Sequence, residues 1–421
     1  MLDLKFIRDN PEQVRKAIQL KLVELNLNEV LAADEAVRNL KLQTQKLQEE
    51  RNANAKKTGK ASPEERPAIV ERGRTIGKEL AELEGQQREA EERLQQYLWL
   101  VPNLPAPDAP IGESEADNVE VKRWGEPTQF DFTPLDHVQI LEKHNWAEFE
   151  RISKVAGSRS YALRNEMVLL EMALLRFALE KLQGKGFNLM SVPSMAREFA
   201  LFGTGHFPTG REQVYYLPAD DLYLSGTAEV PLNSLHTGEI LDESDLPIRY
   251  AGYSPCFRRE AGSGGRDVRG LIRVHQFYKV EQYILCKNDP EESARWHAQL
   301  LATAEEIVQE LEMPYHIVEC CTGDMGAGKY RMHDIETWLP SENKYRETHS
   351  CSSLHDWQAR RSNLRYRDAE GKVRFCHTLN NTAIATPRIL APFLENHQQA
   401  DGTIRLPEKL RPYMGGLDKL G

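Results

Sequence analysis

The sequence predicts an α+β protein in which a long antiparallel helical hairpin precedes a domain built on an antiparallel sheet. A heptad rhythm of three- and four-residue intervals, carried mostly by apolar residues, runs from Val30 to Leu47. It runs again, with two seven-residue gaps, from Ile69 to Val101, as in two long packed helices. After a proline-rich stretch, strand-like runs follow one another without intervening helices, which favours an antiparallel sheet over a doubly wound one. With 421 residues, the chain is long enough for two or three domains.

The composition is that of a globular protein without general attraction for polyanions. The net charge of the chain is −10, so any nucleic-acid partner would have to bind to a local patch of basic residues. Six cysteines show no CxxC spacing, and neither a signal peptide nor an apolar run of transmembrane length occurs. We therefore expect a cytoplasmic protein with reduced thiols and no membrane partner.

The first 100 residues contain the hairpin. Asn10-Pro11 predicts the start of a short first helix. Asn54–Pro67 carries a glycine and two prolines and is expected to form the turn between the long helices. Each arm has about 30 residues, so the hairpin should extend roughly 45 Å at 1.5 Å per residue.

The end of this hairpin is basic. Residues 51–66 hold five basic residues against two acidic ones, a net charge of +3. On this feature alone, a solvated structural turn and a nucleic-acid-binding tip are equally good interpretations. The basic residues are Arg51, Lys56, Lys57, Lys60 and Arg66.

The proline-rich segment Val101–Gly112 is predicted to be a stiff linker, which divides the chain into domains at 1–100 and 113–421 around a linker at 101–112. In the second domain, helical patterns cover Asn165–Gln183 and Glu291–Glu312. Strands are predicted at Val214–Leu217, Leu222–Leu224, Tyr253–Phe257, Leu271–Ile284, Tyr315–Cys320, Ile335–Leu339 and Tyr345–Ser353.

The stretch Tyr253–Tyr283 has the pattern of strand, glycine-rich turn and strand. Because side chains alternate along a strand, Arg258 and Glu260 are expected on one face. A surface ladder of salt bridges would explain the charges of the second strand but not Phe277. A binding surface would explain both, because guanidinium groups bind phosphate or carboxylate and aromatic rings stack on bases. We interpret this face as a binding floor. Its second strand should carry Arg273, His275, Phe277, Lys279 and Glu281, with Ile272, Val274, Tyr278, Val280 and Ile284 on the opposite face.

Three further segments carry groups suited to binding. Thr227 and Glu229 offer a hydroxyl and a carboxylate for an ammonium group, although a helix N-cap explains Thr227 equally well. Glu347 could hold Mg²⁺, and Arg388, close to a helix start, could meet a terminal phosphate. Strand alternation puts Glu347 and Ser350 on opposite faces, so the strand must bulge if both serve one site through their side chains. Histidine and cysteine do not cluster at ligand spacing, and we expect no zinc.

Over essentially its whole length the chain resembles a bacterial-type seryl-tRNA synthetase, a class II aminoacyl-tRNA synthetase. The resemblance implies a homodimer with a class II catalytic domain at 113–421, Gly186–Pro193 at the subunit interface, and a tRNA-binding domain at 1–100 whose arm reaches the long variable arm of tRNA(Ser). It also implies activation of L-serine with ATP to seryl-adenylate, then transfer to the 3′ end of tRNA, with tRNA(Sec) open as a second acceptor. The segments that carry it are the helical arm, GSRSYAL at Gly157–Leu163, FGTGHFP at Phe202–Pro208, TAEV, FRREAG, RGLIRVHQF at Arg269–Phe277, ETHSCS and TLNNTAIATPR.

The same resemblance implies roles for single residues. For catalysis these are Arg258, Glu260 and Arg388, and for serine they are Thr227, Ala228, Glu229, Arg258, Glu281 and Thr382. For tRNA they are Arg51, Lys56, Lys57 and Lys60, and for Mg²⁺ carried with ATP they are Glu347 and Ser350. For ATP they are Arg258, Arg259, Glu260, Arg273, Val274 (through its backbone), Phe277, Glu347, Thr348, His349, Ser350 and Arg388.

Three positions depart from the family pattern. Arg259 stands where relatives usually have serine, and Gly264 where they often have an aromatic residue, so the hairpin loop is expected to differ. Pro392 falls inside the helix after Arg388, where we expect a lost hydrogen bond and a kink.

Two alternatives remain in view. A ligase with a carrier-protein acceptor would share the catalytic domain but lack the arm Val30–Val101. A non-catalytic binding protein would have lost Arg258, Glu281 or Arg388, and all three are present.

Overall fold

The computed structural model describes residues 1–262, 265, 267 and 269–421. These residues form two compact units. One comprises Leu2–Gln19 and Val23–Pro102, and the other comprises Asn103–Gly421 with Met1 and Leu20–Leu22. The expected departure at Gly264 lies outside the described residues.

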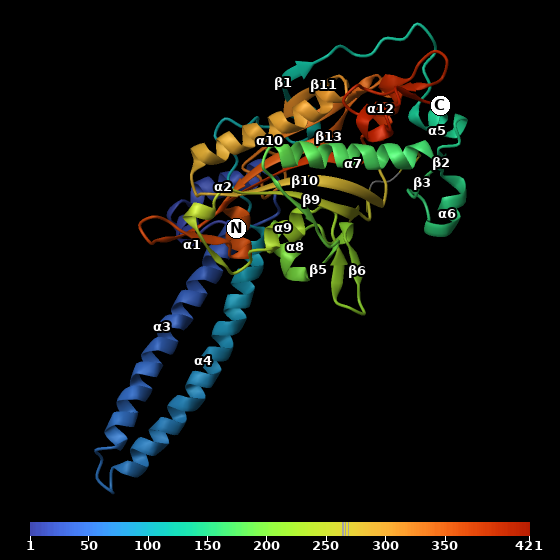
Figure 1. The fold of residues 1–421 in the computed structure, drawn as a ribbon. Helices are drawn as coiled ribbons and strands as arrows, with labels where there is room; N and C mark the ends of the chain where they lie inside the picture. Colours follow the sequence, from blue (N-terminus) through green and yellow to red (C-terminus); the bar gives the residue numbers. More distant parts are fainter. Residues whose placement is uncertain (263–264, 266, 268) are drawn as a thin grey trace. The chain divides into compact units, whose positions relative to one another are not determined.

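The first unit is helical. Two short helices, α1 (Leu4–Asp9) and α2 (Pro11–Leu20), precede the long helices α3 (Leu27–Thr58) and α4 (Arg66–Leu100), which run side by side (Figure 1). The predicted hairpin is therefore confirmed, and α2 begins at the predicted proline. The buried apolar positions of the hairpin extend from its open end, where α3 begins and α4 ends, to Ile76 in the first half of α4. They include Val30, Val37, Ile76, Leu80, Leu94 and Leu98.

The turn of the hairpin is shorter than the sequence predicts. Helix α3 continues through Asn54 to Thr58, so the predicted break at Asn54 is wrong. Pro67 occupies one of the first positions of α4, where a missing N–H costs no intrahelical hydrogen bond. Proline therefore marks the start of the second helix rather than part of the turn.

The second unit is built on an eight-stranded sheet in the order β1-β11-β12-β13-β16-β10-β9-β4. Every neighbouring pair is antiparallel except β4 with β9, which confirms the predicted sheet type. The strands are β1 (Val119–Trp124), β4 (Asn188–Ser191), β9 (Ile248–Phe257), β10 (Gln276–Cys286), β11 (Tyr315–Glu319), β12 (Arg331–Leu339), β13 (Lys344–His355) and β16 (His377–Thr386).

Helices and short strands surround this sheet. The helices are α5 (His137–Lys143), α6 (Glu150–Ala156), α7 (Glu166–Gly184), α8 (Glu198–Thr204), α9 (Glu229–Ser234), α10 (Pro290–Glu310), α11 (Trp357–Ser362) and α12 (Leu390–His397). The short strands are β2 (Ala147–Glu148), β3 (Ala162–Leu163), β5 (Met195–Ala196), β6 (Tyr215–Leu217), β7 (Leu222–Leu224), β8 (Ile240–Asp242), β14 (Arg365–Arg367), β15 (Val373–Phe375), β17 (Ile404–Arg405) and β18 (Lys419–Leu420).

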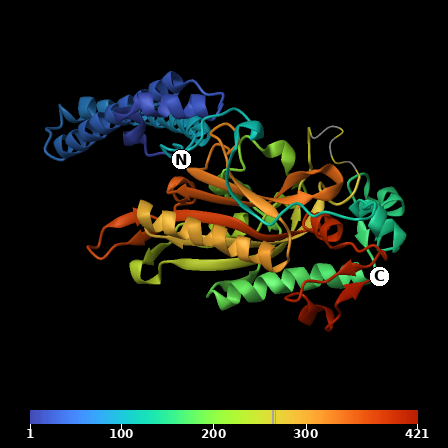
Figure 2. The same ribbon diagram turned by 90° about the horizontal axis from the view of Figure 1, so that it is seen from above.

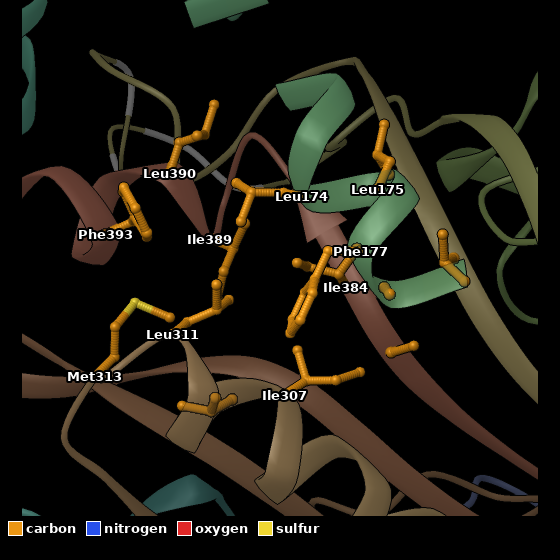
Figure 3. Close-up of a cluster of buried hydrophobic side chains, with 14 of the residues drawn as sticks. Leu174, Leu175, Phe177, Ile307, Leu311, Met313, Ile384, Ile389, Leu390 and Phe393 are labelled. Carbon is orange, nitrogen blue, oxygen red and sulfur yellow. The ribbon is translucent and has the colours of Figure 1, made fainter. Parts of the chain in front are cut away.

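One face of the large sheet carries the main hydrophobic core. Helices α7 and α10 lie along this face (Figures 1 and 2), close to the segments that were predicted to be helical. Figure 3 shows the Phe177 ring of α7 directed toward Ile307 of α10, and Leu174 of α7 beside Ile389. Because α7 and α10 fill this face, we expect a ligand-binding surface on the opposite one, which α9 and α11 cover only in part.

Three further details bear on the sequence predictions. Helix α12 begins at Leu390, so Pro392 lies in its first turn, where backbone N–H groups have no intrahelical acceptor. The expected loss of a helical hydrogen bond is therefore wrong. All six cysteines are buried and unpaired, as expected for reduced thiols. No helix among the described residues is long and apolar enough to span a membrane.

Candidate active site

A pocket of about 210 Å³ lies on the sheet face opposite the main core. Strand β10 supplies its floor. Phe277, Lys279 and Glu281 line the pocket, whereas Tyr278 and Val280 pack into the core. The predicted alternation is therefore confirmed from Phe277 to Ile284, where it follows from the two-residue period of an extended chain. Before Gln276 it is wrong, because β10 begins only there, and Ile272 and Val274 line the pocket whereas His275 is not among its lining residues.

Arg258 and Glu260 reach the pocket by a different route from the one predicted. Strand β9 ends at Phe257, and Glu260 has a φ of 53°, so the two residues do not share the face of a strand. Both nevertheless line the pocket. The Arg258 guanidinium carbon lies 5.3 Å from the centre of the Phe277 ring, within cation–π range.

Glu260 and Arg273 form an ion pair across the mouth of the glycine-rich loop. Arg273 Nη1 lies 2.6 Å from Glu260 Oε2, and both residues line the pocket. Val274 also lines the pocket although it is buried. The pair holds the two ends of the loop together at the pocket.

One end of the pocket holds a buried, ionised carboxylate. Glu229 begins α9, and its Oε1 accepts hydrogen bonds from Gln358 Nε2 at 2.6 Å and Asn380 Nδ2 at 2.9 Å. Burial alone would raise the pKa of Glu229, but the nearby Lys329 charge and the donated hydrogen bonds outweigh it and hold that pKa below its usual range. Thr227 lies beside Glu229, and its Oγ1 accepts a hydrogen bond from the Glu229 N–H at the start of α9 at 3.2 Å. Thr227 also lines the pocket, so its contact with an ammonium group stays a prediction.

A second buried carboxylate, Glu281, forms a recess next to the first. Its Oε2 lies 2.6 Å from Lys279 Nζ and accepts a hydrogen bond from Thr227 Oγ1 at 3.3 Å. Burial raises the pKa of Glu281, and the Lys279 charge opposes that shift most strongly. Thr382 of β16 also lines the pocket.

Strand β13 brings Glu347 and Ser350 to the same pocket through a bulge. Ile335 pairs with His349 and Glu336 pairs with Glu347, so Thr348 is an extra residue on β13. Glu347, Thr348 and Ser350 all line the pocket. The prediction that β13 must bulge if Glu347 and Ser350 serve one site is therefore confirmed.

Arg388 closes the rim of the pocket beside this bulge. Its Nη1 lies 3.3 Å from Glu347 Oε2, and its Nε donates to the carbonyl of Ile272 at 3.3 Å. The Arg388 side chain is therefore held at the pocket by contacts from two different segments.

Three of the expected residues are missing from the described lining of the pocket: Ala228, Arg259 and His349. Ala228 is fully buried in a core cluster with Leu232. The His349 ring is buried on the other side of β13, where its Nε2 lies 3.1 Å from the carbonyl of Ala383, and burial lowers its pKa to about 4. The Arg259 backbone N–H bonds the carbonyl of Gln213. An ATP contact through the His349 side chain is therefore not supported by this geometry, whereas a contact through the exposed Arg259 side chain stays a prediction.

The sequence interpretation overlooked several lining residues. Lys279 was assigned to the correct face but given no role, and Lys329, His206 and Asn380 were not considered. His206 Nδ1 lies 2.8 Å from Thr204 Oγ1, and burial lowers its pKa to about 4, so the ring is neutral. The FGTGHFP and TLNNT segments contain His206 and Asn380, but nothing in their spacing indicates that both approach Glu229.

The expected tRNA-contacting residues lie at the far end of the hairpin. Arg51, Lys56 and Lys57 stand on the last turns of α3, and Lys60 follows in the turn. All four are exposed, and none forms an ion pair among the described residues. The tip therefore presents unneutralised positive charge.

Comparisons with known proteins agree with this geometry. Residues 216–397 match the tRNA synthetase class II core domain (G, H, P, S and T), and residues 1–105 match the seryl-tRNA synthetase N-terminal domain. The chain is 58% identical over 421 residues to a serine–tRNA ligase of Deinococcus radiodurans, covering 100% of this chain and 99% of that protein. The crystal structure of seryl-tRNA synthetase from Pyrococcus horikoshii complexed with ATP superposes with a TM-score of 0.92 at 41% identity, covering 100% and 99% of the two chains. A cytoplasmic serine–tRNA ligase from Naegleria fowleri in complex with AMP gives a TM-score of 0.88 at 28% identity, covering 100% and 98%.

A mainly antiparallel sheet, with α7 and α10 on one face and a charged pocket beside α9 and α11 on the other, together with the matched core, defines a class II tRNA synthetase catalytic domain. The helical hairpin unit and the full-length relatives narrow this class further. The chain belongs to the seryl-tRNA synthetase family.

Proposed function

We propose that the protein activates L-serine with ATP to form seryl-adenylate and transfers the seryl group to the 3′ end of tRNA(Ser). The observation that carries this proposal is the pairing, within one pocket, of a small recess bearing two buried carboxylates with a wider region bearing Phe277 and several arginines. The recess suits a small amino acid with an ammonium and a hydroxyl group. The wider region suits a nucleotide triphosphate.

In the recess, the serine ammonium group binds Glu229 and Thr227, and its carboxylate binds Arg258. The serine hydroxyl lies between Glu281 and Thr382. Alanine would leave these buried polar groups without a partner, and such a loss is large enough to discriminate without an editing site.

In the wider region, the adenine ring stacks on Phe277 and contacts Glu260. Arg258, Arg273 and Arg388 bind the phosphates. Glu260 and Arg273 now bond each other at 2.6 Å, so nucleotide binding exchanges their mutual contact for contacts to ATP.

Glu347 and Ser350 are suited to Mg²⁺ that arrives with ATP. Mg²⁺ is commonly held by one or two carboxylates together with substrate phosphates, and the Glu347 carboxylate is half exposed at the pocket rim. The described residues contain no group of three or more His, Cys, Asp or Glu that could hold a metal without a substrate. When bound, Mg²⁺ would neutralise charge on the phosphates.

The reaction follows from this arrangement. One oxygen of the serine carboxylate attacks the α-phosphorus of ATP, the bond to the bridging oxygen of the β-phosphate breaks, and pyrophosphate leaves. Arg258 stabilises the charge that develops on the α-phosphate oxygens. A hydroxyl of the terminal tRNA ribose then attacks the seryl carbonyl carbon and gives up its proton, the carbon–oxygen bond to the AMP phosphate breaks, and AMP leaves.

The basic tip of the hairpin is the proposed tRNA contact, through Arg51, Lys56, Lys57 and Lys60. Its net charge of +3 in a protein of −10 supports attraction for a polyanion at this point. We further propose that the protein is a homodimer that acts in the cytoplasm. Exposed apolar side chains on α7 and β4, at the edge of the large sheet, support the dimer: Val168, Leu169, Met172 and Leu189.

Exchange of radiolabelled pyrophosphate into ATP, measured without tRNA, tests the proposal. Serine should support exchange, whereas alanine and threonine should not. Exchange with alanine or threonine but not serine would refute the assigned substrate. No exchange with any amino acid would favour a binding protein.

Replacing Glu281 with alanine should raise the KM for serine about 10- to 150-fold, the loss of one hydrogen bond to a charged group worth about 1.5–3 kcal/mol. The KM for ATP should change by less than about threefold, because ATP is proposed to contact other residues. Exchange kinetics with each substrate varied in turn measure both values. Glu260→Ala is the matched variant and should affect mainly the KM for ATP; equal effects of Glu281→Ala on both substrates would contradict its role.

A further inference from the structure

Lys279 is an unusual residue for the floor of this pocket. Its side chain is 7% exposed and that of Glu281 is 3% exposed, and the two groups meet at 2.6 Å. They are two residues apart on β10, so strand alternation brings both to the same face. A lysine is rarely buried this far unless it is paired.

The two oxygens of the Glu281 carboxylate have different surroundings. Lys279 Nζ and Thr227 Oγ1 both contact Oε2. Among the described residues, no hydrogen bond to Oε1 is found, and Glu281 lines the pocket. Oε2 is thus used to fix the carboxylate, and Oε1 remains for a ligand.

The surroundings make the ionised form of Glu281 depend on Lys279. Burial raises the pKa of Glu281, the Lys279 ammonium opposes this most strongly, and the negative charge of Glu229 adds to the rise. Other titratable or charged groups near the two side chains are Arg258, Lys329, His206, Cys256 and Cys351. None of these is found in an ion pair with Glu281 in the part of the chain that the structure describes.

We infer that Lys279 is a positioning residue that fixes the Glu281 carboxylate as the acceptor for the hydroxyl group of the bound amino acid. This inference rests on the proposed serine specificity and deepens it. An ionised acceptor left without a donor is costly, so alanine is strongly disfavoured while Lys279 is present. A protonated Glu281 is neutral, and leaving it without a partner costs less, so selection against alanine weakens.

The test is the pH dependence of the KM for serine in Lys279→Met, whose side chain is similar in length but uncharged. Buried glutamates without a counter-charge have pKa values of about 8–9. Glu281 in the variant should therefore be protonated at pH 6 and ionise as the pH rises toward 9. The ratio of the variant's KM for serine to the wild-type KM should be at least about tenfold at pH 6 and fall toward pH 9; comparison with wild type at each pH removes the titration of serine itself.

Two comparisons separate positioning from a merely structural role. Lys287→Met removes an equally short pair, 2.6 Å from Glu243, outside the described lining of the pocket, and should leave the KM for serine within about twofold of wild type at every pH. In a Glu281→Gln background the carboxylate that Lys279 is proposed to hold ionised is absent, so adding Lys279→Met should introduce no pH dependence beyond that of Glu281→Gln alone. An additional pH dependence in that double variant would overturn the inference.

The outcomes distinguish this inference from the proposed function. If wild-type protein shows no serine-dependent exchange, the proposed function fails. If wild type is active and Lys279→Met follows the wild-type pH profile with unchanged selection against alanine, the inference fails. Should Lys279→Met not fold, Lys279→Arg retains the charge and should keep a level ratio of its KM to the wild-type KM and selection against alanine within about threefold; a pH-dependent ratio in that variant would refute the inference.

Discussion

Replacing Arg258 with alanine is expected to lower serine-dependent ATP–pyrophosphate exchange by about 10²–10³-fold, the usual cost of removing one group that stabilises charge in a transition state. Arg258 lines the pocket and lies over Phe277, where it is proposed to contact both the serine carboxylate and the α-phosphate. The turnover number at saturating serine and ATP measures the effect, because it excludes weaker ground-state binding.

Arg374→Ala is a matched control for the Arg258 variant. Arg374 is half exposed on β15, pairs with Asp368, and lies outside the described lining of the pocket, so exchange should stay within about twofold of wild type. A loss of less than about tenfold for Arg258→Ala would contradict its proposed place at the reacting phosphate.

Removing the hairpin arm should separate the two half-reactions. With residues 28–100 replaced by a short Gly/Ser linker, aminoacylation should fall by more than about 10³-fold, equivalent to at least about 4 kcal/mol of lost tRNA binding. Exchange should stay within about threefold of wild type, because the described pocket is lined only by residues between His206 and Arg388. The linker can be short, since Tyr97 Oη donates to Glu29 Oε2 at 3.0 Å and the open ends of α3 and α4 are therefore adjacent.

A charge reversal at the tip tests the same arm without shortening it. Lys56→Glu, Lys57→Glu and Lys60→Glu together should weaken tRNA binding and reduce the magnitude of its log–log salt dependence by roughly 2–3, about 0.7–0.9 for each lost phosphate contact. For the deletion variant, loss of both exchange and aminoacylation would show that the arm is needed for folding. Unchanged aminoacylation in that variant would show that the arm does not contribute to tRNA binding.

Regular elements of this protein were predictable because their patterns are long. The heptad intervals predict α3 and α4. The alternation along β10 predicts that Phe277, Lys279 and Glu281 share one face, as they do in the pocket. Strand β1 is absent from the sequence prediction although Val119 and Val121 alternate with polar residues, because the run is short and all of its side chains are exposed. Strand β4 was missed for a similar reason, since it is short and largely exposed.

The site was harder to predict wherever the backbone leaves a regular conformation. The positive φ of Glu260 ends the alternation that had placed it with Arg258, although both residues still reach the pocket. His349 was carried into the ATP site by its place in the ETHS segment, but its ring lies in the core. Lys279 received no role because its importance depends on the distance to Glu281, which a strand pattern does not supply.

The extra residue at Thr348 has a consequence for protein engineering. A scaffold with an ideal, regular strand could display the equivalent of Glu347 or of Ser350 toward a nucleotide, but not both, because the two positions differ by an odd number of residues. Transplanting this site would therefore require copying an irregular hydrogen-bond ladder across β12 and β13 as well as the side chains. The position of both side chains at one site depends on the backbone geometry of this bulge. A design that copies only the residue types would not reproduce it.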